Sequence, residues 1–130
     1  MNIFICLCTF NRTRMLNQNI RSLINADLPN NYKLNIIVID NKTNNENRAI
    51  VKKYYNRSKK KYSIIYLTEY KKGIVYARNC FLKHIYKKFS NFDYVGFVDD
   101  DCIVDKFWIK NSLKVLKEKK INIVTGPQLF

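Results

Sequence analysis

Glycine and proline are scarce in this sequence of 130 residues, which has three glycines and two prolines. A chain so poor in both is neither collagen-like nor a disordered segment rich in proline and glycine. The sequence also has no G-x-G-x-x-G motif and no G-x-x-x-x-G-K motif. These glycine-rich loops hold dinucleotides and nucleotide phosphates in two large groups of proteins. Their absence argues against a dinucleotide site and against P-loop chemistry.

Histidine occurs once, at His84, and no two cysteines have the C-x-x-C spacing. A structural zinc site takes its ligands from such clusters of cysteine and histidine, so zinc is not expected. The cysteines are Cys6, Cys8, Cys80 and Cys102. We expect them to be reduced and mostly buried thiols in a cytosolic protein, and we expect His84 to lie on the surface of a helix.

No apolar run approaches the ~18 residues that a membrane-spanning helix needs. The apolar start at Ile3–Phe10 has no basic residue before it and no small-residue cleavage site after it, so it does not read as a signal peptide. We interpret it as a first strand. The length of the chain suits one domain with a real hydrophobic core.

Acidic residues are a minority, with ten Asp and Glu against 24 Lys and Arg, for a formal net charge of +14. A basic surface attracts nucleic acid, anionic lipid or phosphorylated substrates. A lysine-rich solvated surface without a binding role explains the same charge equally well.

Three of the acidic residues stand together at Asp99–Asp101, directly after the apolar run Tyr94–Val98. Adjacent carboxylates raise one another's pKa unless a cation or hydrogen-bond donors offset their charge. Carboxylate oxygen is the ligand that Mg²⁺ and Mn²⁺ prefer. The triplet therefore predicts a site for a metal ion and a phosphate group, and the alternative is a solvated acidic turn.

Apolar runs and helical spacings alternate along the whole chain. The expected strands are Asn2–Cys8, Leu34–Ile39, Tyr62–Leu67, Tyr94–Val98 and Ile121–Thr125, and the expected helices are Thr13–Asn25, Asn44–Asn56, Ile74–Phe89 and Asp105–Lys119. This alternation predicts an α/β fold with a mostly parallel, Rossmann-like sheet and helices on both faces. The usual strand order of such a half is 3-2-1-4. Thr13 is a candidate N-cap for the first helix.

Polar side chains follow the last apolar residue of three expected strands, at Thr9, Asp40 and Asp99–Asp101. Parallel strands end at the same edge of a sheet, and the crevice at that edge is where such folds bind ligands. We therefore expect these residues to converge, with the acidic triplet beside Thr9.

Four segments of the sequence resemble the family 2 glycosyltransferases of the GT-A fold: Thr9–Arg12, Val38–Asn41, Gly73–Asn79 and Phe97–Asp101. The resemblance extends to Gly126 and Pro127 and so covers nearly the whole chain. It implies the fold of nucleotide-diphospho-sugar transferases. It also implies metal-dependent transfer of a sugar from a nucleoside-diphosphate sugar, with a UDP-sugar favoured, to an acceptor hydroxyl on a surface glycan or a lipid-linked sugar.

The same resemblance implies roles for single residues. The residues implied in nucleotide-sugar binding are Thr9, Arg12, Asp40, Arg78, Asn79, Asp99 and Asp100. Asp40 would contact the base, Asp99 would face the ribose or sugar, and Asp101 would ligate Mn²⁺ or Mg²⁺ through the diphosphate of the donor. Packing or local capping is an alternative for Asn79. We expect Asp105 to be a helix N-cap and Trp108 to belong to the core.

Members of this family continue with an acceptor-binding half, which carries the general base of the inverting enzymes. No residue after Gly126 can supply that base, so we expect residues 1–130 to form a single GT-A nucleotide-sugar-binding domain, without the acceptor half and without a catalytic base. Apolar surface left open in such a domain favours association, which predicts a homodimer. The expected location is the cytoplasm, with a peripheral contact of the basic surface to an anionic membrane.

Several alternatives stay open. The chain could bind a nucleotide sugar without activity, or it could be a basic α/β domain that binds nucleic acid, with an affinity that falls steeply with salt and ignores the triplet. A nucleotidyltransferase usually has a glycine-rich loop after its first strand, and Thr9–Thr13 has no glycine. A receiver-type domain has a single aspartate on its central strand rather than three.

Overall fold

The computed structural model describes residues 1–55 and 61–127. Within these ranges strands and helices alternate in the order β1 (Asn2–Thr9), α1 (Thr13–Ile24), β2 (Lys33–Asp40), α2 (Asn45–Tyr55), β3 (Tyr62–Thr68), α3 (Ile74–Lys88), β4 (Tyr94–Asp99) and α4 (Trp108–Lys119). The predicted alternation is confirmed. Each strand continues one residue beyond its apolar run, because the polar residue that follows still pairs in the ladder.

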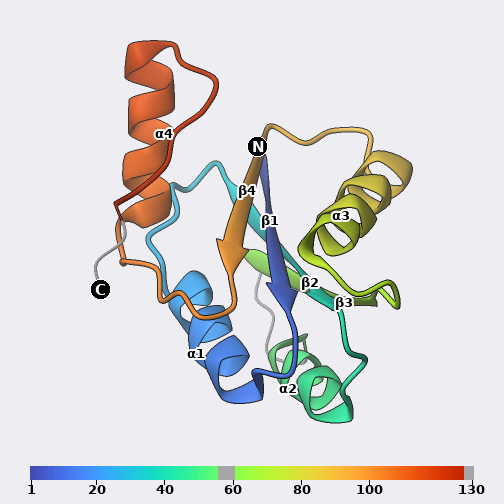
Figure 1. Cartoon of the computed structure of the whole chain (residues 1–130). Helices are drawn as coiled ribbons and strands as arrows, with labels where there is room; N and C mark the ends of the chain where they lie inside the picture. The colour runs from blue at the N-terminus through green and yellow to red at the C-terminus, as the bar shows by residue number, and fades with distance from the viewer. Residues whose placement is uncertain (56–60, 128–130) are drawn as a thin grey trace.

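The strands form one parallel sheet in the order β3-β2-β1-β4, as predicted. Figure 1 shows β1 and β4 side by side with their arrowheads on the same side of the molecule. The register places Thr9 opposite Asp40 and Cys8 opposite Asp99. The polar residues that end these strands therefore share one edge of the sheet.

Helices cover both faces of the sheet, but unequally (Figure 1). On one face, side chains of α1, α2 and α4 pack together with the strands. On the other face, α3 packs against the strands through Ala77, Phe81 and Ile85. Burial of these apolar side chains is the main favourable term in folding. The second face of β4 is left partly open, and Phe97 there is 43% exposed.

Residues 121–125 form no strand, contrary to the prediction. Their β-branched apolar side chains suit a strand, but a strand also needs a neighbour for its backbone hydrogen bonds. Among the described residues, the outer strand β4 pairs with β1 only. Ile123 is 84% exposed, and Gly126 lies close to the indole of Trp108. Trp108 is itself half-buried against the core, as expected.

Two predicted helix caps are wrong. Thr13 is the first residue of α1, and its hydroxyl donates to Asn47 Oδ1 at 2.9 Å instead of capping the helix. Helix α4 begins at Trp108, so Asp105 lies ahead of it. The Asp105 carboxylate accepts a hydrogen bond from the Phe107 backbone N–H at 2.8 Å, and so closes a separate turn before the helix. None of the helices in residues 1–55 and 61–127 has the length and apolar character to cross a membrane.

The four cysteines are free thiols, as expected, but only Cys6 is buried. Cys8 lies near the end of β1 and Cys102 in the loop after β4, where the core gives way to solvent. Their partial exposure follows from those positions, and the prediction of mostly buried thiols is wrong.

Candidate functional site

The carboxyl edge of the sheet brings Thr9 and the acidic triplet into contact, as predicted. Thr9 ends β1, and its hydroxyl donates a hydrogen bond to Asp100 Oδ2 at 2.8 Å. The two residues are separated by 91 positions in the sequence. Their contact fixes the loop after β4 against the loop after β1.

Asp100, the middle carboxylate of the triplet, points into the protein. Its side chain is 8% exposed. Besides the Thr9 hydroxyl, Oδ2 accepts the Phe10 backbone N–H at 3.4 Å, and Oδ1 accepts Arg12 Nη1 at 3.3 Å. A buried carboxylate is tolerable when donors of this kind satisfy it. Asp100 therefore supports the site, and its contact with a nucleotide sugar stays a prediction.

Asp99 and Asp101, the outer carboxylates, face solvent, with side chains 57% and 51% exposed. Each has one arginine beside it. Arg12 Nη1 lies 3.1 Å from Asp101 Oδ2, and Arg78 Nη2 lies 3.5 Å from Asp99 Oδ1. Exposed ion pairs are worth only about 0–1 kcal/mol. Both outer carboxylates are therefore available to a cation that competes with the arginines.

Arg78 reaches the triplet from α3, on the opposite side from Arg12. Its guanidinium also lies over the ring of Phe97, 5.4 Å from the ring centroid. Asn79 follows it and is exposed on the same helix. The N-cap of α3 is Gly73, so Asn79 does not cap the start of the helix. The arrangement places one cation on each side of the acidic turn.

Asp40 reaches the same edge but is completely buried. Its carboxylate accepts five hydrogen bonds, from the backbone N–H groups of Lys42, Thr43 and Asn44 and from the side chains of Asn47 and Tyr66. Burial by itself would raise the pKa of Asp40, but the hydrogen bonds from Tyr66 and the loop outweigh it and lower the pKa. In this structure Asp40 anchors the loop after β2, and its contact with a base stays a prediction.

Asn41 is a residue of this edge that sequence reasoning missed. Its Oδ1 accepts the Gly73 backbone N–H at 2.8 Å, and its Nδ2 donates to the carbonyl oxygens of Glu69 and Lys71 at 2.7 and 2.8 Å. These bonds hold the segment between β3 and α3 beside the end of β2, and so set where α3 and Arg78 begin. The partners are backbone atoms, which leave no signature in a sequence.

The oxygen donors at this edge suit a divalent cation that takes most of its ligands from elsewhere. Among residues 1–55 and 61–127, no group of three or more His, Cys, Asp or Glu side chains is placed to hold a metal ion by itself. Mg²⁺ is usually held by one or two carboxylates together with substrate phosphates and water. The exposed carboxylate of Asp101 meets that requirement, and the donor set fits Mn²⁺ or Mg²⁺.

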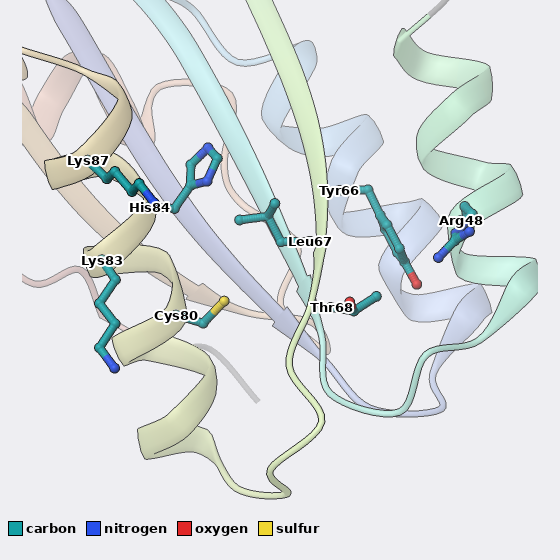
Figure 2. A pocket seen from close by; sticks show the side chains of 8 residues that line it. All are labelled: Arg48, Tyr66, Leu67, Thr68, Cys80, Lys83, His84 and Lys87. Carbon is teal, nitrogen blue, oxygen red and sulfur yellow. The ribbon is translucent and has the colours of Figure 1, made fainter.

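A hollow of about 510 Å³ lies away from the triplet, around the edge strand β3. Figure 2 shows its lining side chains, which come from α3, from β3 and from Arg48 of α2. It is lined by Arg48, Tyr66, Leu67, Thr68, Cys80, Lys83, His84 and Lys87. His84, expected on the surface, is half-buried here. Cations beside an edge strand discourage pairing with other chains, and none of the predicted site residues lines this hollow.

The chain is similar to two longer proteins whose names refer to the synthesis of succinoglycan and of chondroitin. Succinoglycan biosynthesis protein ExoM of Rhizobium meliloti (strain 1021) is 31% identical over 127 residues, which are 98% of this chain and 38% of that protein. Chondroitin synthase of Pasteurella multocida (strain Pm70) is 25% identical over 130 residues, which are 100% of this chain and 12% of that protein. The chain thus spans well under half the length of either relative.

Solved structures share the fold. The structure of S. aureus TarS 1-349 in complex with UDP superposes with a TM-score of 0.75 at 22% identity, over 98% of this chain and 38% of that one. The mannosyltransferase PcManGT from Pyrobaculum calidifontis, in complex with GDP-Man and Mn²⁺, superposes with a TM-score of 0.72 at 18% identity, over 88% of this chain and 32% of that one. At these identities the likeness shows the fold alone.

The sequence profile described as "Glycosyl transferase family 2" matches residues 4–129. That match covers the sheet except Asn2 and Ile3 at the start of β1, and it includes helices α1 to α4 and the acidic turn. The chain therefore belongs to glycosyl transferase family 2.

Proposed function

We propose that residues 1–130 are the donor-binding portion of a metal-dependent glycosyltransferase, which moves a sugar from a nucleoside-diphosphate sugar to an acceptor hydroxyl. The observation that carries the proposal is the acidic turn at the carboxyl edge of the sheet, where Asp100 is buried against Thr9 while Asp99 and Asp101 face solvent. A UDP-sugar is favoured as donor. TarS in complex with UDP and with UDP-GlcNAc supports that choice, and PcManGT with GDP-Man and Mn²⁺ supports the need for a metal ion.

In this proposal each charged side chain at the acidic turn has a separate role in binding the donor. Asp101 holds Mn²⁺ or Mg²⁺, which when bound neutralises charge on the departing nucleoside diphosphate. Arg12 and Arg78 attract the diphosphate from the two sides of the turn. Asp99 faces the ribose or sugar, and Thr9 lines the pocket and holds Asp100 in place.

Asp40 and Asn79 complete the proposed nucleotide site. Asp40 can contact the base only through an oxygen that a loop amide or Tyr66 now occupies, so we propose that it also acts by holding the loop after β2. Asn79 follows Arg78 on the exposed side of α3 and would approach the nucleotide from there.

The acceptor, the location and the assembly are proposals of wider scope. The names of the two relatives favour polysaccharide biosynthesis, with a glycan or a lipid-linked sugar as acceptor. Four free thiols favour the cytoplasm, and the positive charge favours a peripheral contact with anionic membrane. Exposed Val95, Phe97 and Ile103 favour a homodimer, which light scattering would detect. Acceptor binding and the general base are not assigned to these residues.

Calorimetric titration with UDP, in Mn²⁺ and in EDTA, tests the proposed function. We expect Mn²⁺ to lower the Kd of UDP by at least about tenfold, equivalent to about 1.4 kcal/mol. A titration with GDP shows whether another base is preferred. Equal affinity for UDP in Mn²⁺ and in EDTA would contradict metal-dependent donor binding. Salt-sensitive binding of a nucleic acid that the triplet does not affect would favour the alternative of a nucleic-acid-binding domain.

Replacing Arg12 should have opposite effects on the affinity for the metal ion and on the affinity for the nucleotide. Its guanidinium and a divalent cation compete for Asp101 Oδ2, so Arg12→Gln should bind Mn²⁺ alone about two- to fivefold more tightly, as expected for the loss of an exposed ion pair. The same variant should bind UDP about tenfold more weakly, because a cation facing the diphosphate is lost. Electron paramagnetic resonance of free Mn²⁺ and calorimetry with UDP measure the two effects. Arg14→Gln, at an exposed position in the first turn of α1, is the matched control. Weaker binding of Mn²⁺ by Arg12→Gln would refute the competition.

A further inference from the structure

The buried side chain of Asn19 joins helix α1 to the backbone of the acidic turn. Asn19 lies in the middle of α1 and is 0% exposed. Its Nδ2 donates hydrogen bonds to the carbonyl oxygens of Asp99 and Cys102, both at 2.8 Å. These two carbonyls lie at the two ends of the turn, and the Cys102 backbone N–H closes the turn on Asp99 O at 3.1 Å. One amide group therefore holds both ends of the segment that carries the triplet.

The orientation of this amide is fixed by its surroundings. The –NH₂ of asparagine has two hydrogens to donate, and both are used on the two carbonyls. Rotating the amide by half a turn would place Oδ1 against two carbonyl oxygens, with no hydrogen between them. Oδ1 in turn has no hydrogen-bond partner within residues 1–55 and 61–127. A buried acceptor without a hydrogen bond calls for an explanation. Here the explanation is that the amide is oriented so that both of its N–H groups bond the turn, which leaves Oδ1 without a partner.

The outer carboxylates of the triplet have little else to position them. Asp101 is half exposed; it forms a solvent-facing ion pair with Arg12 and accepts a long hydrogen bond from the Cys102 thiol at 3.8 Å. Asp99 is similarly exposed beside Arg78. The direction of both side chains therefore depends on the backbone of the turn, and Asn19 holds that backbone at its two ends.

We propose that Asn19 is a positioning residue of the donor site: it holds the turn at Asp99–Cys102 in the shape that lets Asp101 serve a metal ion bound with a nucleoside diphosphate. The second half of this statement rests on the proposed function. Asn19 touches neither metal nor nucleotide in this role. We call the two hydrogen bonds from Asn19 to the turn the clamp. Small displacements of a ligating group are costly in sites of this kind. Loss of the clamp should therefore weaken nucleotide binding mainly when the metal ion is present.

Nearby Ser22 supplies a matched control on the same helix. Its hydroxyl donates to Asn19 O at 2.8 Å and accepts the Val104 backbone N–H at 3.1 Å. It joins α1 to the loop beyond the turn but does not hold the turn itself. Ser22→Ala therefore shows how weaker packing of α1 on this loop, without loss of the Asn19 hydrogen bonds, affects the turn.

Hydrogen exchange tests the clamp without any ligand. In the wild-type chain, the side-chain amide protons of Asn19 should exchange at least about tenfold more slowly than those of exposed Asn111, since buried and bonded amides are protected. In Asn19→Leu, which removes both donors at similar volume, the Cys102 backbone amide should exchange at least about tenfold faster, while Ser22→Ala changes it by less than about threefold. If Asn19→Leu fails to fold, Asn19→Ala takes its place, since alanine also removes both donors and is a strong helix former. Wild-type Asn19 protons that exchange like those of Asn111, or unchanged exchange at Cys102 in a folded variant, would overturn the clamp.

Titration with UDP separates positioning from a purely structural role. In Asn19→Leu the gain in UDP affinity caused by Mn²⁺ should fall by at least about tenfold, while the Kd of UDP in EDTA changes by less than about threefold. Faster exchange at Cys102 with an unchanged effect of Mn²⁺ would show a structural clamp only and would overturn the positioning role. A wild-type chain whose UDP binding ignores Mn²⁺ would contradict the proposed function instead, and with it the positioning role, while the exchange measurement would still decide whether the clamp exists.

Discussion

Asp101→Asn is expected to raise the Kd of UDP measured in Mn²⁺ by about tenfold to a hundredfold, and to leave the Kd measured in EDTA within about twofold of the wild-type value. The substitution keeps the size of the side chain and one oxygen but removes the negative charge that a hard divalent cation requires. Asp101 is half exposed, and within residues 1–55 and 61–127 its one ion pair is with Arg12. The variant should therefore fold normally, and the loss should appear as a change in metal-dependent binding measured by calorimetry.

Asp105→Asn is the matched control for this prediction. It makes the same change of charge four residues further along, at an exposed position where the carboxylate accepts a hydrogen bond from the backbone N–H of Phe107. We expect its UDP affinity in Mn²⁺ to match that of the wild type. If both variants lose affinity equally, the effect comes from overall charge, and Asp101 has no special relation to the metal ion.

Asp40→Ala should lower the free energy of unfolding by about 3–5 kcal/mol, because several buried donors lose their acceptor at about 1–3 kcal/mol each and only some of them find water instead. Five donors converge on this carboxylate, and its removal leaves them without an acceptor inside the protein. Tyr66→Phe removes only one of the five and should cost about 1–2 kcal/mol. Urea denaturation of the three proteins measures both differences. A loss for Asp40→Ala no larger than that for Tyr66→Phe would show that the network does not depend on the carboxylate.

The lowered pKa of Asp40 predicts how the free energy of unfolding depends on pH. Because the pKa of Asp40 is lower in the folded protein than its ordinary value of 3.8, its contribution is fully present above that value. The contribution is lost as the pH falls through the lower pKa of the folded state. Asp40→Ala should therefore be less stable than the wild type at neutral pH, with the gap narrowing in acid below pH 3.8. A gap that stays constant down through that range in urea denaturation would contradict the lowered pKa.

Much of the fold followed from the spacing of apolar residues. The runs that became β1 to β4 are continuous and bounded by polar residues, so their type and parallel order could be predicted. The run at Ile121–Thr125 looks the same in sequence, but forming a strand depends on a partner, which a local pattern does not contain. The convergence of Thr9 with the triplet followed from the strand order, since parallel strands end at one edge.

The separate structural roles of the residues at this edge could not be predicted in the same way. Which of the three aspartates turns inward depends on the turn after β4, where the simple alternation of strand side chains ends. Asn19 and Asn41 act on backbone carbonyls and amides, which are identical in every residue and give no pattern to recognise. Asp40 was expected to face a ligand because it is charged and follows a strand, and its five internal donors became visible only in three dimensions.

The inward-facing carboxylate of Asp100 makes the proposed donor site part of the hydrogen-bonded framework of the fold. Thr9 at the end of β1 and Phe10 and Arg12 just after it all hydrogen-bond to Asp100, so the residues proposed for the nucleotide and for the metal ion are joined through one buried group. Damage to that group should be visible as a lower melting temperature in the absence of any sugar nucleotide. A thermal melt of the free protein can thus report whether the site is assembled, before its donor or acceptor has been identified.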